Sequence, residues 1–470
     1  MQPTALYPRL AVILHFLLPS FVQHRIWPAS SKPRRLFATS WLDGLRGVAA
    51  YLVSMFHYTE HHFDWYLYPY GFNNPDDHVP SSPLQLPFIR LVYSGRPMVH
   101  VFFVISGFVL SYKPLKLIRK HDYNGLLRTL SSSIFRRGFR LFLPVFSITL
   151  IVIALIRLGW IYHALPTFRE QIRDWYRSIF ITVSSSWDWD GPRDLPYNAH
   201  LWTIPIEYSN SLFLFLVLTG MSRLKTCLRL VLLVCIIMFC LSSRHWAPAE
   251  FLMGMGIAEV QLIQDAYQEQ QVAIFKDEEN AESENFLAPS RPRASSIWVA
   301  QLLFKLFIAA NLIFALFVFG WPSHNFDKTP GISAIWRHTM EPFWSSGGNL
   351  WVIFPWYALS SAQLVLAIQQ TKSLQKIFVT PLAQYLGNVS YSFYLFHGIV
   401  QAMVARHILF YLWPLVGGRD EAGVWGRMFV WFWGKVFTDI PTFWAADILW
   451  RTVDMKSVEW SRWIEGICTI

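Results

Sequence analysis

The sequence predicts an all-α integral-membrane protein, a bundle of about ten transmembrane helices. Its 470 residues are 53% hydrophobic and only 15% charged, whereas globular chains carry about 25% charged residues. Apolar runs of about 18 or more residues recur along the whole chain, and a run of that length crosses the hydrocarbon core of a bilayer as a helix. The expected spans are 41–62, 96–115, 139–161, 202–220, 226–242, 248–264, 297–320, 349–369, 382–413 and 424–446.

The distribution of basic residues predicts the orientation of these spans. If the N-terminus is cytosolic and the spans alternate, the inner segments hold about twice as many Lys and Arg residues as the outer ones. The largest group lies between Lys113 and Arg140. This bias predicts that both termini are cytosolic. It also explains the net charge of +10 through membrane topology, so the expected partner is a lipid bilayer, with no nucleic acid. The expected location is the endoplasmic reticulum or another endomembrane.

The chain divides into a membrane domain at 41–446, a cytosolic or interfacial segment at 1–40 and a cytosolic tail at 447–470. Inside the membrane domain, 264–296 is polar and lacks apolar periodicity, which predicts a disordered cytosolic loop. The outer segment 161–199 contains the amphipathic stretch FREQIRDWYRSIF, which is expected to lie in the membrane interface. Because no soluble catalytic domain fits, any chemistry must lie within the spans or at their ends.

The first span contains two ionisable residues, Arg46 and His57. Their spacing places both on one face of a helix, about 16 Å apart along its axis. Ionisable residues inside a span usually face a polar cavity or each other. Together they predict a polar track through the bilayer. The alternative is that Arg46 only reaches the lipid headgroups and that His57 only caps the outer end of the helix.

Five motifs follow one another along the chain: LDGLRG with Arg46 and His57, VFFVISGFVLSY at 101–112, FRRGFRLFLP at 135–144, HLWTIPIEY at 200–208 and YLGNVSYSFYLFHGIV at 385–400. Together they resemble the multi-pass membrane acyltransferases, often called acyltransferase type 3. The resemblance extends from residue 41 to about residue 445. The long outer segments and the single glutamate in HLWTIPIEY are similar to the fungal branch. The resemblance implies an O-acyltransferase that uses cytosolic acyl-CoA as its co-substrate.

The resemblance and the chemistry of acyl transfer assign catalytic roles to three residues. His57 is the expected base, because an imidazole takes and returns a proton near neutral pH. Arg46 is expected to hold the pantetheine end or the thioester of the acyl donor. Glu207 lies where the family has a membrane-embedded glutamate, and we expect it to pair with Arg46 or to bond to His57. The alternative for Glu207 is a protonated carboxyl in the helix core. Asp43 is placed to form a local pair with Arg46.

Four further residues are expected to bind the acyl-CoA co-substrate. Arg136, Arg137 and Arg140 lie at the cytosolic end of a span, where guanidinium groups bind phosphates through paired hydrogen bonds. The alternative is that these arginines only orient the span. Ser106 lies beside Gly107, and small residues there predict close helix packing. A role for the Ser106 hydroxyl beside the thioester is the secondary interpretation.

No metal site is expected. The four cysteines lack the spacing of metal ligands or of a disulfide framework, and we interpret them as apolar packing residues. Glu60, His61 and His62 are adjacent in sequence, but successive helical residues point about 100° apart. His100 and His397 are either packing residues or members of the site.

The sequence therefore predicts an O-acyltransferase that moves an acyl group, acetyl by default, to a hydroxyl of a small hydrophobic molecule. The fungal resemblance suggests a terpenoid or polyketide in a secondary-metabolite pathway. A glycan acceptor is one alternative. A proton-coupled secondary transporter is another, because buried Arg, Glu and His residues also occur in such carriers. The sequence does not predict an oligomeric state.

Overall fold

In the computed structural model, the described residues are 15–26, 36–72, 79–187, 195, 197–281, 294–344 and 350–469. Across these ranges the regular elements are all helices, so the all-α prediction is confirmed. The α-helices are α2 (Ser20–Ile26), α3 (Ser40–His62), α4 (Arg96–Arg119), α5 (Tyr123–Arg157), α6 (Phe168–Ser184), α7 (Thr203–Gly220), α8 (Thr226–Ser242), α9 (Trp246–Ala281), α10 (Ala294–Phe319), α11 (Ile332–Arg337), α12 (Glu341–Trp344), α13 (Phe354–Gln370), α14 (Lys372–Phe378), α15 (Pro381–Val400), α16 (Arg406–Leu412), α17 (Val424–Leu449) and α18 (Met455–Cys468).

Shorter helical turns connect several of these helices. Five-residue π-helical turns join α15 to α16 and α17 to α18, at Gln401–Ala405 and Trp450–Asp454. The 3₁₀ turns are η3 (Asp64–Leu67), η4 (Pro83–Gln85), η5 (Ile89–Tyr93), η6 (Ser185–Trp187), η7 (Ala199–Trp202), η8 (Phe326–Lys328), η9 (Leu350–Ile353) and η11 (Trp413–Val416).

Each expected span contains a helix, but the structure does not confirm a count of ten membrane crossings. Within the described ranges, six segments are long and apolar enough to cross a membrane: Arg96–Arg119, Tyr123–Arg157, Ala199–Gly220, Val299–Phe319, Trp351–Gln370 and Pro381–Val416. Helix α8 is apolar but shorter. The other three expected spans are α3, α9 and α17, which carry ionisable residues along their length.

Several of these ionisable residues pair inside the bundle. Glu259 of α9 accepts from Arg229 of α8 at 2.5 Å and from Arg119 of α4 at 2.6 Å. His100 and Glu250 lie 2.5 Å apart and are buried. A buried charge is tolerated when a partner compensates it. A hydropathy criterion alone therefore misses α9, although its buried carboxylates have partners inside the bundle.

Two closely packed helix pairs, α3 with α15 and α4 with α9, form the centre of the bundle. A Cβ at Gly47 of α3 would lie 2.3 Å from the backbone nitrogen of Gly387 in α15. A Cβ at Gly107 of α4 would lie 2.0 Å from the carbonyl oxygen of Phe251 in α9. Only glycine allows these backbones to approach so closely, as expected for small residues between membrane helices. The close packing predicted for Gly107 is confirmed.

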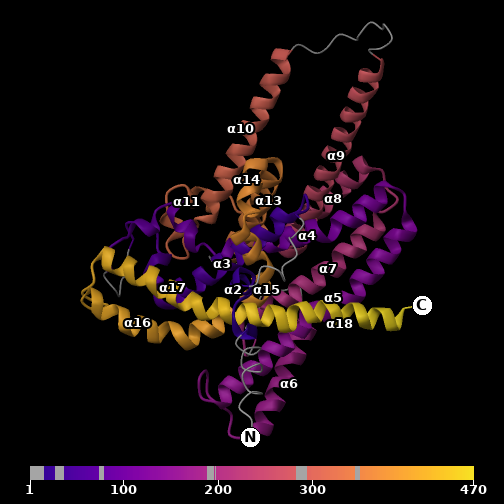
Figure 1. Cartoon of the computed structure of the whole chain (residues 1–470). Helices are drawn as coiled ribbons and strands as arrows, with labels where there is room; N and C mark the ends of the chain where they lie inside the picture. Colours follow the sequence, from indigo (N-terminus) through magenta and orange to yellow (C-terminus); the bar gives the residue numbers. More distant parts are fainter. Residues whose placement is uncertain are drawn as a thin grey trace.

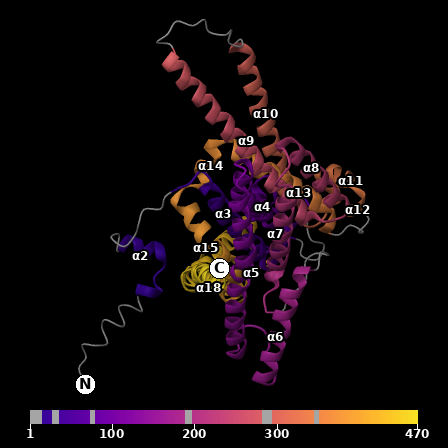
Figure 2. The same ribbon diagram turned by 90° about the vertical axis from the view of Figure 1, so that its right-hand side faces the viewer.

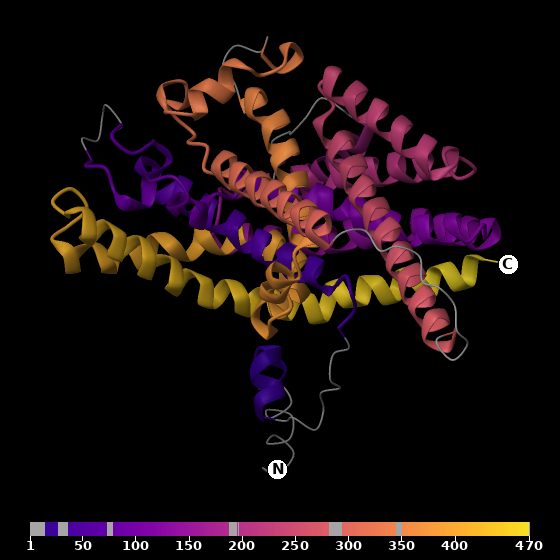
Figure 3. The ribbon, with the colours of Figure 1, turned by 90° about the horizontal axis from the view of Figure 1, so that it is seen from above.

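Long helices give the molecule its shape. Helices α17 and α18 run in one line across the bundle, and α9 and α10 extend from one end of it (Figure 1). A view turned by 90° again shows α9 and α10 at one end and α6 at the other (Figure 2). Seen from above, the line of α17 and α18 passes along one side of the remaining helices (Figure 3). The residues between these two helices, Trp450–Asp454, therefore lie beside the bundle centre.

Two segments that the sequence predicts to lie outside the spans contain long helical stretches. In the expected loop 264–296, α9 continues to Ala281 and α10 begins at Ala294, and 282–293 lies outside the described residues. The Gln and Glu residues of this stretch favour helix even without an apolar face. The expected tail 447–470 ends as α18, which packs against α5.

The N-terminal segment and the expected interfacial stretch also contain helices. Ser20, at the start of α2, donates from its backbone nitrogen and its hydroxyl to the Asp447 carboxylate of α17, at 3.0 and 2.6 Å. Helix α6 forms in the amphipathic stretch and begins with a capping box between Thr167 and Glu170, which satisfies backbone donors of its first turn. Its location in the membrane interface stays a prediction.

Candidate active site

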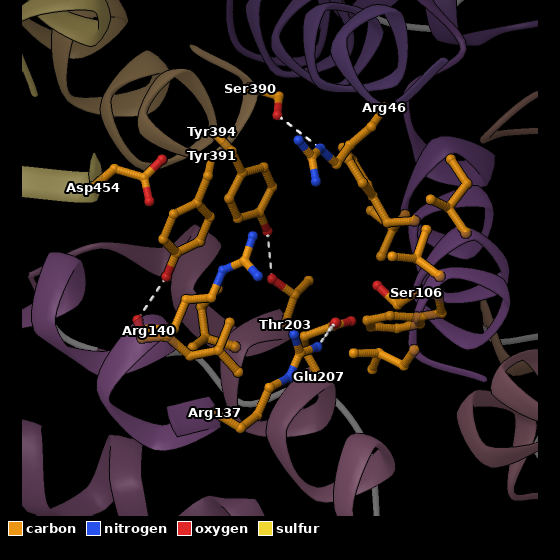
Figure 4. A pocket seen from close by; sticks show the side chains of 18 of the residues that line it. Arg46, Ser106, Arg137, Arg140, Thr203, Glu207, Ser390, Tyr391, Tyr394 and Asp454 are labelled. Carbon is orange, nitrogen blue, oxygen red and sulfur yellow. Dashed lines mark hydrogen bonds and ion pairs between the residues drawn. The ribbon is translucent and has the colours of Figure 1, made fainter. Parts of the chain in front are cut away.

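A cavity of about 200 Å³ lies between α3, α4, α5, α7 and α15. One wall is apolar and comes from α4, with Phe102 and Phe103 among its residues. The opposite walls carry polar and charged side chains, which converge on the same space (Figure 4). Of the predicted site residues, five line this cavity: Arg46, Ser106, Arg137, Arg140 and Glu207. The cavity therefore unites predicted site residues from four of the five motifs, and it leaves His57 and Arg136 outside.

Glu207 pairs with Arg137, which corrects the sequence-based expectation of a bond to Arg46 or His57. The guanidinium of Arg137 forms an ion pair with Glu207 and donates at 2.9 Å to the Ser211 hydroxyl. The Arg137 and Glu207 side chains expose only 10% and 14% of their surfaces. Helices α5 and α7 pack side by side, so the cation and the carboxylate face each other across that contact. Which cation pairs with Glu207 depends on which helix packs against α7, and the spacing of residues along the chain does not reveal that packing.

Arg46 is held at the junction of α3 and α15. Its Nε donates to the Ser390 hydroxyl at 3.0 Å, and its Nη2 donates to the Gly387 carbonyl at 3.1 Å. Its Nη2 also lies 3.3 Å from Asp43. The local pair predicted between Asp43 and Arg46 is confirmed. These contacts fix the guanidinium at the edge of the cavity, with 36% of the side chain exposed.

Arg140 differs from the other two cavity arginines. Among the described residues it forms no hydrogen bond or ion pair, and it is exposed. Asp454, from the turn between α17 and α18, lines the same cavity (Figure 4). The lining thus contains three guanidinium groups and two carboxylates. Because one guanidinium keeps its donors unoccupied, the cavity suits an anionic ligand.

Arg136 lies outside the cavity lining. Its Nε is 3.1 Å from Glu465 of α18 and 3.2 Å from the Ser132 carbonyl of its own helix. Arg136 and Arg137 are neighbours in sequence but have different partners, because adjacent residues of a helix point about 100° apart. Arg137 faces the cavity, and Arg136 faces the C-terminal helix.

His57 belongs to a second group of polar residues, beyond one wall of the cavity. Its ring centroid lies 4.2 Å from that of His200 and 5.6 Å from that of His397. Its Nδ1 lies 3.2 Å from Oε2 of Glu60, and Oε1 of Glu60 accepts from Arg96 at 3.1 Å. We call His57, His200 and His397 the histidine cluster. The cluster carries a carboxylate partner for the predicted base.

The cavity and the histidine cluster share a wall. The hydroxyl of Tyr394 donates at 2.6 Å to the carbonyl oxygen of His200. The same hydroxyl is 2.8 Å from that of Thr203. Tyr394 and Thr203 both line the cavity. The ring of Tyr394 also lies 5.8 Å from that of His397, so this one residue contacts both the cavity and the histidine cluster.

Residues 39–446 match the acyltransferase domain family, over most of the chain. The chain belongs to the acyltransferase type 3 family. The O-acetyltransferase PaAT-1 of Phomopsis amygdali is 30% identical to it over 482 aligned residues, which cover 96% of this chain and 88% of the relative. The acyltransferase clz18 of Cochliobolus lunatus is 22% identical and covers 83% of this chain and 88% of its own length. No solved structure matches the chain.

Membership of this acyltransferase family, together with the apolar helices, makes the chain an integral membrane protein. The family resemblance drawn from the five motifs is confirmed. The relatives named here come from fungi, as the resemblance to the fungal branch implied. The roles assigned to individual residues stay predictions.

Sequence reasoning about this acyltransferase missed Glu60, His200 and Asp454. Glu60 follows His57 by three residues, the same spacing that predicted the pair of Asp43 and Arg46, so the signal for it was present. His200 opens the HLWTIPIEY motif, but nothing in the sequence places it beside His57. Asp454 had no signal, because its position depends on the course of α17 past α15. His100 packs against Glu250 and Trp246, away from both groups.

Proposed function

We propose that this protein is an O-acyltransferase that moves an acyl group from acyl-CoA to a hydroxyl of a small hydrophobic acceptor. Acetyl is the default acyl group, and the relative PaAT-1, an O-acetyltransferase, supports that choice. The proposal depends above all on one observation. A cavity with the unpaired guanidinium of Arg140 lies beside the histidine cluster, in which His57 has a carboxylate partner.

The cavity is the proposed site for the acyl-CoA. Coenzyme A carries several phosphates, and an arginine with unoccupied donors binds phosphate through two parallel hydrogen bonds. Arg140 has that freedom, and Arg137 adds positive charge beside it while Glu207 holds it in place. Arg46 and Ser106 line the same cavity, and we propose that they contact the pantetheine arm and the thioester. Arg136 is left out of this proposal, because Glu465 holds it outside the cavity.

His57 is the proposed base, and Glu60 is its positioning residue. An ionised carboxylate can only accept hydrogen bonds. In the contact with Glu60, Nδ1 of His57 is therefore the protonated nitrogen and donates. The Nε2 atom then keeps the lone pair that a general base needs. Arg96 holds the other oxygen of Glu60 and so restricts the carboxylate.

The transfer step balances with these groups. Nε2 of His57 takes the proton of the acceptor hydroxyl as the hydroxyl oxygen attacks the thioester carbonyl carbon. A new C–O bond forms, the C–S bond breaks, and the thiolate of coenzyme A leaves. The imidazolium then returns the proton to the sulfur, so the products are an ester and free coenzyme A. Because His57 does not line the cavity, the thioester must pass the contact of Tyr394 with Thr203 to reach it.

We further propose that the acceptor is a product of fungal secondary metabolism, such as a terpenoid or polyketide with a free hydroxyl. The fungal relatives support this setting. The proposed location is the endoplasmic reticulum or another endomembrane, with both termini cytosolic. In that orientation the Lys- and Arg-rich segments face the cytosol, where acyl-CoA is made.

The test uses purified protein in lipid nanodiscs with acetyl-CoA labelled in the acetyl group and a panel of hydroxylated terpenoids and polyketides. The expected result is a labelled ester, or slow release of labelled acetate when no acceptor fits, and either must disappear in the His57→Ala variant. Absence of acetyl-CoA binding, hydrolysis and transfer would overturn the proposal. Proton-driven solute uptake into sealed vesicles, without transfer of label, would instead identify a transporter.

A further inference from the structure

Two nitrogen atoms of the histidine cluster carry lone pairs with defined directions. Nδ1 of His397 is 2.7 Å from the carbonyl oxygen of Tyr394, so this nitrogen donates and Nε2 carries the lone pair. The His397 side chain is fully buried, and its Nε2 has no partner in the part of the chain that the structure describes. The contact of Nδ1 with Glu60 leaves the lone pair of His57 on Nε2 as well, on a side chain that is 23% exposed. A buried acceptor without a partner is costly and calls for a ligand.

The third imidazole completes a group with the dimensions of a metal site. One ring nitrogen from each of His57, His200 and His397 lies within 4.8 Å of the others. Zinc binds imidazole nitrogen at about 2.0–2.1 Å, so its tetrahedral ligands lie about 3.4 Å apart. Binding of the ion would draw these nitrogens together by rotation of the rings, from separations of up to 4.8 Å to about 3.4 Å. Metal-binding histidines usually donate their second N–H to a carboxylate or a backbone carbonyl, and His57 and His397 do so here.

The fold builds this group from three separate elements. His57 comes from α3, His200 from η7 and His397 from α15. A Cβ at position 398 would lie 2.3 Å from Nε2 of His200, so the ring of His200 occupies space that only Gly398 leaves open. The cluster therefore exists only in the folded bundle, and His200 enters it because the residue after His397 has no side chain.

We propose that His57, His200 and His397 form a binding site for a divalent transition-metal ion such as Zn²⁺, and that the bound ion inhibits acyl transfer. A metal ion on Nε2 of His57 takes the lone pair that removes the acceptor's proton. The inhibitory part rests on the proposed function, because it needs His57 to be the base. The metal site itself does not depend on that role.

A neighbouring group competes with this assignment. His57, Glu60 and His61 also bring ligand atoms within 4.8 Å of one another, but His61 is exposed. Both groups share His57, so a His57 variant does not distinguish them. His61→Asn removes only the neighbouring group, and His200→Asn removes only the histidine cluster. Asparagine keeps polarity at each position but is a poor zinc ligand.

The binding test is a Zn²⁺ titration of the chelator-treated full-length protein in nanodiscs, without acyl-CoA. We expect one ion per chain for the native protein and for His61→Asn. We expect at least about tenfold weaker binding for His200→Asn. Gly398→Ala, which forces the His200 ring away while all histidines remain, should weaken binding in the same direction. Native affinity in His200→Asn, or no binding by the native protein above the level of His57→Ala, would overturn the site.

The activity test adds Zn²⁺ to the acetyl-transfer assay. Inhibition that a chelator reverses, and that needs at least about tenfold more Zn²⁺ in His200→Asn, supports the inhibitory role. Loss of activity in the chelator alone would overturn it and identify a catalytic ion. Zn²⁺ binding without inhibition would overturn the inhibitory role while the site stands. If no variant transfers acetyl groups, the proposed function fails, and the titration still decides the site.

Discussion

The carboxylate of Glu60 lies 3.2 Å from Nδ1 of His57, one turn further along α3. Arg96 of α4 holds the second oxygen of Glu60 at 3.1 Å. A carboxylate in this position fixes both the orientation of an imidazole and the nitrogen that carries its proton. His57, the base that the sequence predicts, thus has a carboxylate partner that the sequence analysis did not assign.

Replacing His57 with alanine should lower turnover by at least about a hundredfold, the usual contribution of a general base. The variant should still insert and fold, because the neighbouring His200 and His397 rings tolerate a small residue. The measurement is single-turnover transfer from labelled acetyl-CoA, with folding checked by size-exclusion chromatography. A rate near that of the native protein would move the base assignment to His397 first.

Replacing Glu60 with glutamine should lower turnover by at least about tenfold, because the amide no longer fixes the proton on Nδ1 of His57. The KM for acetyl-CoA should stay unchanged, since Glu60 lies outside the cavity. Asp43→Asn is the matched control on the same helix. Asp43 contacts Arg46 at the cavity edge, so its loss should change KM more than turnover. Equal effects of both variants on KM would argue against a positioning role for Glu60.

Lysine at position 140 should raise the KM for acetyl-CoA by about tenfold, because lysine keeps the charge but loses the paired hydrogen bonds. Arg137→Lys should mainly destabilise the protein, since Arg137 is paired with Glu207 and bonded to Ser211. The two variants are compared by acetyl-CoA dependence of the rate and by thermal inactivation. If Arg140→Lys leaves KM unchanged while Arg140→Gln disturbs insertion, Arg140 serves topology alone.

Alanine at Gly47 should destabilise the protein by about 1–3 kcal/mol, because its Cβ would press against the backbone of α15. Gly220→Ala is the control, since a Cβ there has open space around it, and alanine favours helix. Thermal unfolding of the two variants in the same detergent checks the difference. Equal stability would mean that α3 and α15 separate at little cost.

The orientation is testable by cysteine accessibility in sealed microsomes, after the four native cysteines are replaced by serine. Gln270→Cys, exposed on α9, should react with a membrane-impermeant reagent added on the cytosolic side. Asp327→Cys, exposed in η8, should react only after the membrane is opened. This follows from ten alternating spans with a cytosolic N-terminus. Cytosolic labelling of both positions would contradict the predicted number of spans.

The features that depend on local pattern were predictable from the sequence. Apolar runs give helices, because each backbone polar group in lipid must be satisfied within its own segment. The pair of Asp43 and Arg46 follows from helical spacing. The gathering of Arg46, Arg137, Arg140, Ser106 and Glu207 in one cavity was predictable only through the family motifs, since no spacing rule links separate helices.

The sequence by itself determined the all-α membrane class, the helices in the ten expected spans and the family, because these follow from composition, periodicity and short motifs. Only the tertiary structure decided that Glu207 pairs with Arg137, that Arg136 faces α18, and that His200 and His397 surround His57. Which buried charges pair with each other depends on which helices are in contact and on how far each helix is shifted along its axis relative to its neighbour. In this chain that depends on glycines such as Gly47 and Gly398, whose missing side chains allow backbones and rings to approach.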